Sequence, residues 1–433
     1  MVVAPRTVAA VAHGSDAVRH EPRGVDTLSA SSSPFVNGAG AVTLVGTGAP
    51  GSSGNGAIAS LAELDGPGGI AEDRQGDLFI ADTDNCSVRE VPSSPGIHYS
   101  VQMAAGDIYA IAGGTCVTAG SSGSSGSSAG RLSGFPTSVA VDSAGDVFVA
   151  DATANEVFEL PAAGGQHFAT DMSTGRLTVV AGDGSAGDTG DRQLASTAEL
   201  DGPVGVGVDP AGDLFVADTE SCEVREVAAG DGTQWGISML AGHIYTVAGT
   251  GTCGETGDGG PADQAELWDP VDVAVGPEGD LLVSDGGGEE ILDLPRGSGT
   301  FYGMHIAADH LAVVAGIGMY GPYLIDGLPA TGETAELNSP AGIALDAAGD
   351  LYIADTYSSC IREVPATNIT QHGKVLTGGD MYTVAGALQG NLGDSTTWTG
   401  PEMLYPVGIA LSPDGAVVYS DLGANVVREL PTG

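Results

Sequence analysis

The chain has 433 residues, of which 70 are Gly and 23 are Pro. So many helix breakers are unusual in a helical bundle but normal for short strands joined by many turns, and the composition therefore predicts an all-β fold. The net charge of −43 reflects 56 acidic residues against 13 basic ones. Because binding to a nucleic-acid backbone requires Lys and Arg, we exclude nucleic acid as a partner, and an anionic membrane surface is disfavoured for the same reason.

The first part of the chain differs from the rest. Residues 1–40 are rich in Ser, Ala and charge and carry no strand pattern, which predicts a disordered tail. Residues 41–46, with the sequence Ala-Val-Thr-Leu-Val-Gly, have the pattern of one short strand. No run of 18 or more apolar residues occurs anywhere, so we expect no membrane insertion.

A phrase of about 16 residues then recurs six times. Its first copy, residues 67–82, ends in Leu-Phe-Ile-Ala-Asp, and a Pro lies 15 residues before the final Asp in every copy. The six repeated aspartates are Asp82, Asp151, Asp218, Asp285, Asp355 and Asp421. Repeats of this length predict a stack of similar units rather than a single irregular core.

Each repeat is predicted to form four short strands, here called a to d from first to last. In the third copy, strand a follows Pro203, strand b covers residues 214–217, strand c covers 223–227 and strand d covers 244–248. A Gly follows strand d at a constant distance of 31 residues from the repeated Asp, and all variation in length falls in the links between this Gly and the next Pro. Constant four-stranded units with variable links are typical of a β-propeller, with the links on one face.

The ends of the chain predict how the ring closes. The sixth repeat has strands a, b and c but no strand d, whereas residues 41–46 match strand d without the other three. We therefore expect a six-bladed propeller over residues 41–433, in which the N-terminal strand completes the C-terminal blade and removes a free sheet edge.

Two stretches of the repeat resemble a known family. Residues 343–356, Ile-Ala-Leu-Asp-Ala-Ala-Gly-Asp-Leu-Tyr-Ile-Ala-Asp-Thr, and residues 245–262 are similar to NHL repeats of bacterial extracellular proteins. The Asn-His-Leu tripeptide itself is absent, so no role for its His is transferred to this chain. The resemblance implies a β-propeller that binds a partner, and some related propellers act as lyases or hydrolases at the mouth of the central channel.

Four of the five cysteines occupy matched places. Cys86 and Cys222 lie four residues after their repeated Asp, and Cys116 and Cys253 lie shortly after the end of strand d. Because the start of strand c adjoins the end of strand d, we expect the disulfides Cys86–Cys116 and Cys222–Cys253. Such bridges predict an extracellular or cell-surface protein. Cys360 is one residue out of phase and is expected to stay a free thiol.

Residues that keep the repeat are interpreted as structural. We expect each repeated Asp to cap its own b-to-c turn by accepting backbone N–H groups. The acidic residue eight positions later receives the same interpretation. The histidines between strands c and d, His98 and His167 among them, should lie on the face opposite the links, so we expect no zinc site at the channel mouth.

Residues that break the repeat are better candidates for a binding site. Ser138 and Asp272 replace a Gly that four other blades carry on strand a, next to the central channel. The links add acidic side chains and possible apolar contacts: Asp183, Asp188, Asp191, Glu255, Asp258, Asp326, Glu333, Trp268, Tyr320, Tyr323 and Trp398. A face this acidic attracts cations or a basic partner. Calcium is possible, but no segment has the ligand spacing of an EF-hand, and no cofactor is predicted.

The sequence thus favours an exported, monomeric binding or scaffold protein that recognises a peptide, glycan or protein partner of cationic character on its link face. The alternative is a lyase or hydrolase at the channel mouth, in which Asp272 with Ser138 supplies a base or a metal site. No Gly-x-Ser-x-Gly, His-Glu-x-x-His or phosphate-binding Gly-rich motif occurs.

Overall fold

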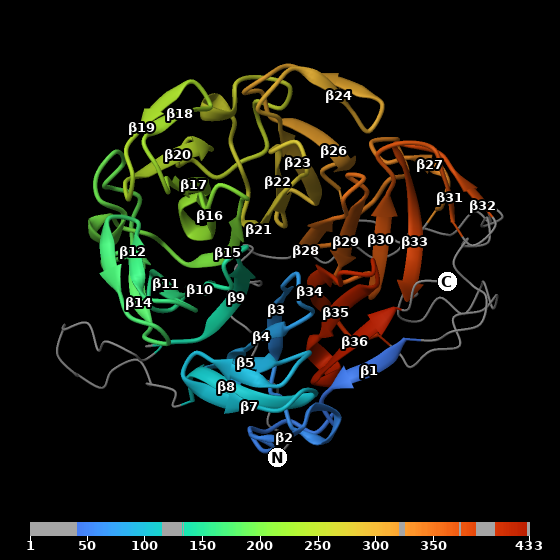
Figure 1. The fold of residues 1–433 in the computed structure, drawn as a ribbon. Helices are drawn as coiled ribbons and strands as arrows, with labels where there is room; N and C mark the ends of the chain where they lie inside the picture. Colours follow the sequence, from blue (N-terminus) through green and yellow to red (C-terminus); the bar gives the residue numbers. More distant parts are fainter. Residues whose placement is uncertain are drawn as a thin grey trace, which may run out of the picture.

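The computed structural model describes residues 41–114, 132, 134–319, 325–371, 374–386 and 403–430. These residues form a ring of six antiparallel blades, as predicted (Figure 1). The predicted tail of residues 1–40 lies outside the described residues. Within the described part, no helix is long and apolar enough to cross a bilayer.

Each blade is a sheet of four strands that lie side by side, with the first strand next to the central channel and the last strand at the outer rim. Blade 1 contains β3 (Pro67–Glu72), β4 (Leu78–Asp82), β5 (Ser87–Val91) and β8 (Asp107–Gly113). Blade 2 contains β9 (Pro136–Val141), β10 (Val147–Asp151), β11 (Glu156–Leu160) and β14 (Thr178–Ala181). Blade 3 contains β15 (Pro203–Val208), β16 (Leu214–Asp218), β17 (Glu223–Val227) and β20 (Ile244–Ala248).

The remaining blades repeat this order. Blade 4 contains β21 (Pro270–Val275), β22 (Leu281–Asp285), β23 (Glu290–Leu294) and β26 (Ala312–Gly316). Blade 5 contains β28 (Pro340–Leu345), β29 (Leu351–Asp355), β30 (Cys360–Val364) and β33 (Asp380–Gly386). Blade 6 contains β34 (Pro406–Leu411), β35 (Val417–Asp421), β36 (Val426–Leu430) and β1 (Val42–Val45).

The N-terminal strand closes the ring, which confirms the predicted closure. Strand β1 pairs antiparallel with β36, with Val42 opposite Glu429 and Thr43 opposite Arg428. The side chain of Val45 is fully buried in a cluster that joins blade 6 to blade 1. Strands from the two ends of the chain therefore share one sheet (Figure 1).

The hydrophobic core lies between the blades rather than in one centre. One cluster, for example, packs Phe215 and Val224 of blade 3 against Leu281 and Val283 of blade 4. The strands alternate in the usual way, so each sheet buries both faces against its two neighbours. The blades thus form a rigid frame, and the loops at their two ends are held in fixed positions.

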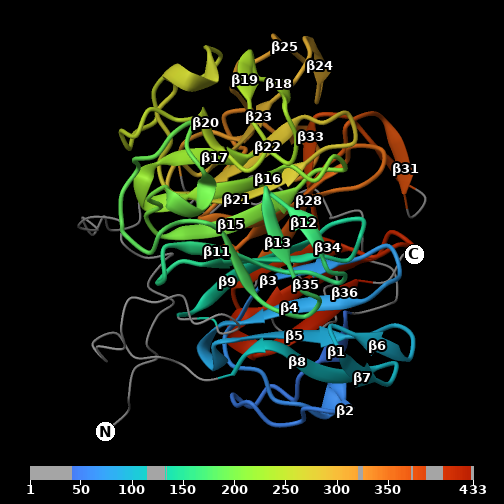
Figure 2. The same ribbon diagram turned by 60° about the vertical axis from the view of Figure 1, so that its left-hand side comes forward.

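Between strands c and d, the structure adds short hairpins that the sequence did not predict. They project from the rim of the ring, where Figure 2 shows β6 and β7. The hairpins of blades 1 to 5 are β6 (Gly96–His98) with β7 (Val101–Met103), β12 (Gly165–His167) with β13 (Thr170–Met172), β18 (Gly232–Gln234) with β19 (Ile237–Met239), β24 (Gly299–Phe301) with β25 (Met304–Ile306), and β31 (Ile369–Gln371) with β32 (Lys374–Leu376). They lie at the ends of strands c and d opposite the links.

The links carry short elements of their own. Strand β2 (Ala57–Ile58) pairs with β8, and β27 (Leu328–Pro329) pairs with β33. Six single-turn 3-10 helices occupy links and b-to-c turns: η1 (Ala59–Leu61), η2 (Thr83–Asn85), η3 (Ala195–Thr197), η4 (Thr219–Ser221), η5 (Ala262–Gln264) and η6 (Leu422–Ala424).

Candidate functional site

The six repeated aspartates fasten the links to the blades. One carboxylate oxygen of each accepts a hydrogen bond from the backbone N–H of the residue 17 positions earlier, in the preceding link. In blades 1 and 6 the same Asp also pairs with a buried arginine of strand c, at 3.1 Å for Arg89–Asp82 and 3.2 Å for Arg428–Asp421. We predicted donors in the b-to-c turn, but the donor shared by all six blades lies in the link, because the link folds back beside the end of strand b.

The central channel holds Ser138 and Asp272. It is a cavity of about 250 Å³ lined by the six innermost strands. Ser138 is buried, whereas Asp272 is partly exposed and accepts the backbone N–H of Ile343 at 3.0 Å. Desolvation within the ring raises the pKa of Asp272 to about 7, which places its ionisation close to neutral pH. The neighbouring Gly205 has no room for a side chain, because a Cβ there would lie 2.6 Å from the Asp272 Cα.

The predicted acidic residues of the links fall into two groups. Asp183, Asp188 and Asp258 are exposed, as are Asp191, Glu255 and Glu333. Asp326 differs, because its side chain is only 7% exposed and its Oδ1 accepts the backbone N–H of Thr383 at 2.8 Å. Its carboxylate holds strand d of blade 5 and does not project into solvent. Tyr320, Tyr323 and Trp398 lie outside the described residues.

In blade 3, an arginine compensates the acidic side chains of the link. Asp191 accepts the backbone N–H of Thr246 at 2.7 Å, and its Oδ1 lies 3.5 Å from the fully buried guanidinium of Arg225. The same guanidinium lies 3.6 Å from Glu223 and 3.5 Å from Asp218. Three carboxylates thus share one positive charge.

In blade 4, none of the ion pairs among the described residues brings an arginine to the equivalent carboxylates. Glu255 and Asp258 occupy the link positions of Asp188 and Asp191, and Leu292 takes the place of Arg225 in strand c. Burial, followed by repulsion from Asp258 and Glu255, raises the pKa of Glu290 to about 8. We call Glu255, Asp258 and Glu290 the blade 4 acidic cluster.

An exposed tryptophan lies in the same link. Trp268 is 39% exposed, and its backbone N–H is bound by Asp285. Its indole covers the b-to-c turn of blade 4, which has the sequence Gly286-Gly287-Gly288. A Cβ at Gly287 would lie 2.6 Å from the Trp268 Cδ1, so the glycine is what allows the ring to lie there. The link therefore presents an exposed aromatic side chain over this turn.

This link is held in place at both ends. The disulfide Cys222–Cys253 joins its beginning to the b-to-c turn of blade 3, which confirms one predicted bridge. The backbone of Gly254 then donates to the carbonyl of Leu267 at 3.0 Å, immediately before Trp268. The predicted partner of Cys86, Cys116, lies outside the described residues, so that bridge stays a prediction. Cys360 is a free, buried cysteine, as predicted.

Two tyrosines on the link face were missed by the sequence analysis. Tyr357 and Tyr405 are 44% and 38% exposed, and their rings meet edge to face at 5.8 Å. Tyr357 stands in the b-to-c turn of blade 5, where blades 1 and 3 carry Asp84 and Glu220. This replacement of an acidic residue by an aromatic one is the signal that could have found it.

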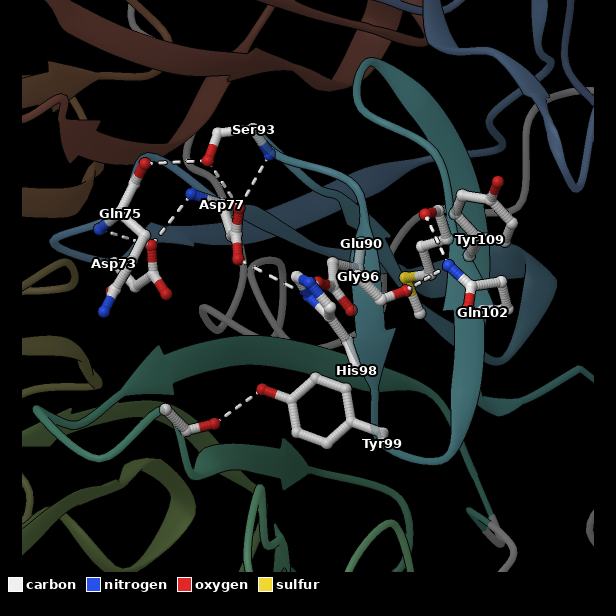
Figure 3. Close-up of polar contacts among 12 residues, drawn as sticks. Asp73, Gln75, Asp77, Glu90, Ser93, Gly96, His98, Tyr99, Gln102 and Tyr109 are labelled. Atoms are coloured by element: carbon white, nitrogen blue, oxygen red, sulfur yellow. Dashed lines mark hydrogen bonds and ion pairs between the residues drawn. The ribbon is translucent and has the colours of Figure 1, made fainter.

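A separate set of polar residues lies at the opposite face, under the hairpins. In blade 1, His98 Nδ1 is 2.5 Å from Glu90 Oε1 and 3.5 Å from Asp77 Oδ2, and Figure 3 shows the imidazole directed at both carboxylates. In blade 2, the equivalent distances from His167 are 2.5 Å to Glu159 and 3.2 Å to Asp146. Each triad could hold a metal ion.

From the sequence, Glu90 and Glu159 are interpreted as structural, no role is predicted for Asp77 or Asp146, and the histidines are expected on this face. The sequence analysis did not bring the glutamates and the histidines together. The signal was a His eight residues after the Glu in both blades, from Glu90 to His98 and from Glu159 to His167.

Comparison with known proteins supports the fold. The NHL repeat model matches residues 337–363, which include strands β28 to β30 of blade 5. The protein SUPPRESSOR OF QUENCHING 1 (chloroplastic) of Arabidopsis thaliana is 27% identical over 221 residues, which cover 50% of this chain but only 18% of that relative.

Two solved structures of auxiliary nutrient binding proteins are also similar. The one from Bacteroides thetaiotaomicron has a TM-score of 0.54 at 12% identity, and the one from Bacteroides ovatus has 0.52 at 14%. Each match covers 90% of this chain and 76% of the other chain. At this level of identity the likeness shows the fold alone.

Proposed function

We propose that this six-bladed β-propeller, which carries an NHL repeat in blade 5, is a binding protein whose link face holds a cationic group of a peptide or protein partner at blade 4. The observation that carries this proposal is the blade 4 acidic cluster, where Asp258 and Glu255 are near enough to raise the pKa of Glu290 and the arginine found in blade 3 is replaced by Leu292. A bound ammonium or guanidinium group would supply the missing positive charge.

Trp268 supports the same chemistry. An exposed indole on the same link as carboxylates can place its face against a cation while the carboxylates accept its hydrogen bonds. Because the disulfide and the backbone pairing hold the link in place, little ordering of the loop is needed when a partner binds. The net charge of −43 adds long-range attraction that falls with salt.

We further propose that the protein works outside the cell or at its surface. The support is the disulfide Cys222–Cys253, since such bridges persist in oxidising compartments. Calcium is a possible competitor for the same carboxylates, because it prefers oxygen ligands. Monomeric behaviour stays a prediction.

The experiment is a fluorescence anisotropy titration of a labelled hexa-arginine peptide. We expect binding that weakens as salt is raised and that falls at least about tenfold in the double variant Glu255→Gln/Asp258→Asn. The matched control, Asp183→Asn/Glu333→Gln, removes two exposed carboxylates outside the cluster and should change the affinity by less than about threefold. Equal losses in both double variants would contradict the site. Addition of calcium chloride tests the competing ion, and a glycan array on the same variants tests a sugar ligand instead.

A second candidate function rests on the channel. Desolvation raises the pKa of Asp272 to about 7, and a carboxylate with such a pKa in the central channel can act as a general base. A lyase or hydrolase at this site would lose activity in Asp272→Asn while keeping peptide binding on the link face.

A further inference from the structure

The two histidine triads on the face away from the links have features of metal sites that the fold itself does not require. In each, an Asp from the a-to-b turn, a Glu from strand c and a His from the following hairpin direct one ligand atom toward a common point, with these atoms within 4.8 Å of one another. They belong to neighbouring blades, and they lie at the opposite end of the blades from the proposed peptide site.

The buried glutamates lack partners for part of their polar surface. Glu90 and Glu159 are both 0% exposed, yet Glu90 Oε2 has no hydrogen-bond partner among the described residues. A buried carboxylate oxygen without a donor is costly unless a proton or a cation compensates it.

The aspartates are positioned by contacts outside the triads. Asp77 Oδ1 accepts the backbone N–H of Ser93 at 2.6 Å and its hydroxyl at 2.8 Å, which leaves Oδ2 directed at His98 (Figure 3). Asp146 Oδ1 accepts the backbone N–H of Ala162 at 2.7 Å in the same manner. Such outer contacts orient metal ligands in known sites.

The next two blades show what the same positions do without a histidine. In blade 3, Gln234 donates to Asp213 at 2.6 Å, and Trp235 donates to Glu226 at 2.5 Å. In blade 4, Phe301 occupies the position of His98. A buried acid in strand c is thus a feature of the fold, whereas an imidazole above it is a feature of blades 1 and 2 within the described part of the chain.

We propose that Asp77, Glu90 and His98 bind one zinc ion and that Asp146, Glu159 and His167 bind a second. Two carboxylate oxygens and one imidazole nitrogen match the ligand preference of zinc, and three protein ligands leave a fourth position for water. The imidazoles are 19% and 23% exposed, so an ion can enter from solvent. This inference goes beyond the proposed peptide binding and does not depend on it.

The test compares zinc content in the wild type and in His98→Gln, His167→Gln and the double variant. Gln is the residue of blade 3 at this position, so each variant adopts a side chain that the fold already accommodates. After equilibration with zinc chloride and gel filtration, mass spectrometry of the metal should show one ion fewer per chain in each single variant and two fewer in the double variant. Calorimetric titration with zinc chloride should show the same loss of sites.

Glu226→Gln in blade 3 is the matched control, and it should keep the zinc content of the wild type. Circular dichroism and peptide binding should be unchanged in every variant, which separates loss of a ligand from loss of the fold. The proposal is overturned if the double variant retains the wild-type zinc content, or if the wild type takes up no zinc.

Discussion

Blades 3 and 4 share one backbone plan and differ in how they treat the same acidic positions. In blade 3, Arg225 lies between the carboxylates of the link and of strand c, and Thr246 ties Asp191 to strand d. In blade 4, Leu292 and Val313 occupy those two positions, and the carboxylates of Asp258 and Glu255 repel that of Glu290. Acidity alone therefore does not mark a binding site, because the carboxylates of blade 3 share the positive charge of Arg225, whereas those of blade 4 do not.

The same two blades differ again at the hairpin end. Glu226 receives a hydrogen bond from Trp235 in blade 3, whereas neither oxygen of Asp293 in blade 4 has a partner among the described residues. Blade 4 therefore carries uncompensated carboxylates at both ends.

The largest effect is expected from Arg225→Leu, which gives blade 3 the residue of blade 4. Removal of a fully buried guanidinium leaves Asp218 and Glu223 without their positive partner, so the free energy of unfolding should fall by about 3 to 5 kcal/mol. Urea denaturation at neutral pH measures it. Arg192→Leu, at an arginine that is 72% exposed, should cost less than about 0.5 kcal/mol. Similar costs for the two variants would show that Arg225 neutralises nothing.

Loss of the disulfide in Cys222→Ser/Cys253→Ser comes next. The bridge closes a loop of 31 residues, and its removal should lower the free energy of unfolding by about 2 to 4 kcal/mol. Because the link of blade 4 then loses one attachment, peptide affinity should fall as well. Cys360→Ala removes a free thiol and should leave peptide affinity unchanged. An unaltered affinity in the double Ser variant would mean that the disulfide does not preorganise the site.

The uncompensated carboxylate at the hairpin end of blade 4 is tested by the stability of Asp293→Asn as a function of pH. Burial raises the pKa of Asp293 from 3.8 to about 8, so the folded state binds a proton that the unfolded state releases between these values. Wild-type stability therefore declines as pH rises from about 4 to 8, and the variant should be more stable than the wild type at pH 8, by on the order of 1 to 3 kcal/mol, with the difference vanishing near pH 4.

The comparison for this prediction is Glu226→Gln. Glu226 has Trp235 as a donor, so the Gln variant should gain less stability at pH 8 than Asp293→Asn does. Thermal unfolding across the pH range measures both. A stability of Asp293→Asn that follows the wild type at every pH would refute the assignment of an unpartnered, buried carboxylate.

The smallest effect is expected from Trp268→Ala. If its indole contacts a bound cation, the loss of that contact should weaken hexa-arginine binding by about two- to fivefold. Trp268→Phe should restore part of the affinity, since a smaller aromatic face remains. An Ala variant that binds as tightly as the wild type would remove the tryptophan from the site but leave the acidic cluster.

The fold could be predicted from the sequence because the same residues recur at the same positions of every repeat. The Pro before strand a, the Gly of the a-to-b turn and the repeated Asp fix the blades, and the unmatched strand at 41–46 fixes the closure. The hairpins between strands c and d were not predicted, since their strands are only three residues long and too short for a clear alternating pattern. The donor to each repeated Asp could not be read either, because it depends on how the link folds back.

The candidate sites were only partly readable. Single departures from the repeat, such as Asp272 and Trp268, pointed to the link face and the channel. The sequence could not show which acidic side chains are compensated by a positive charge. Asp191 and Asp258 occupy the same position of their links, and only the structure shows that Asp191 lies near an arginine. For the same reason Glu90 and His98 were interpreted separately, although the hairpin brings them within 2.5 Å.

The central claim is that the missing arginine makes blade 4 the binding site. Its most direct test measures the dissociation constant of hexa-arginine for Glu255→Gln/Asp258→Asn and for Asp188→Asn/Asp191→Asn, which remove the same charge from the same positions of adjacent blades. We predict a loss of at least about tenfold for the blade 4 pair and less than about threefold for the blade 3 pair. Equal losses in the two variants would contradict the claim. Binding of the peptide would then be explained by the overall charge of the protein alone.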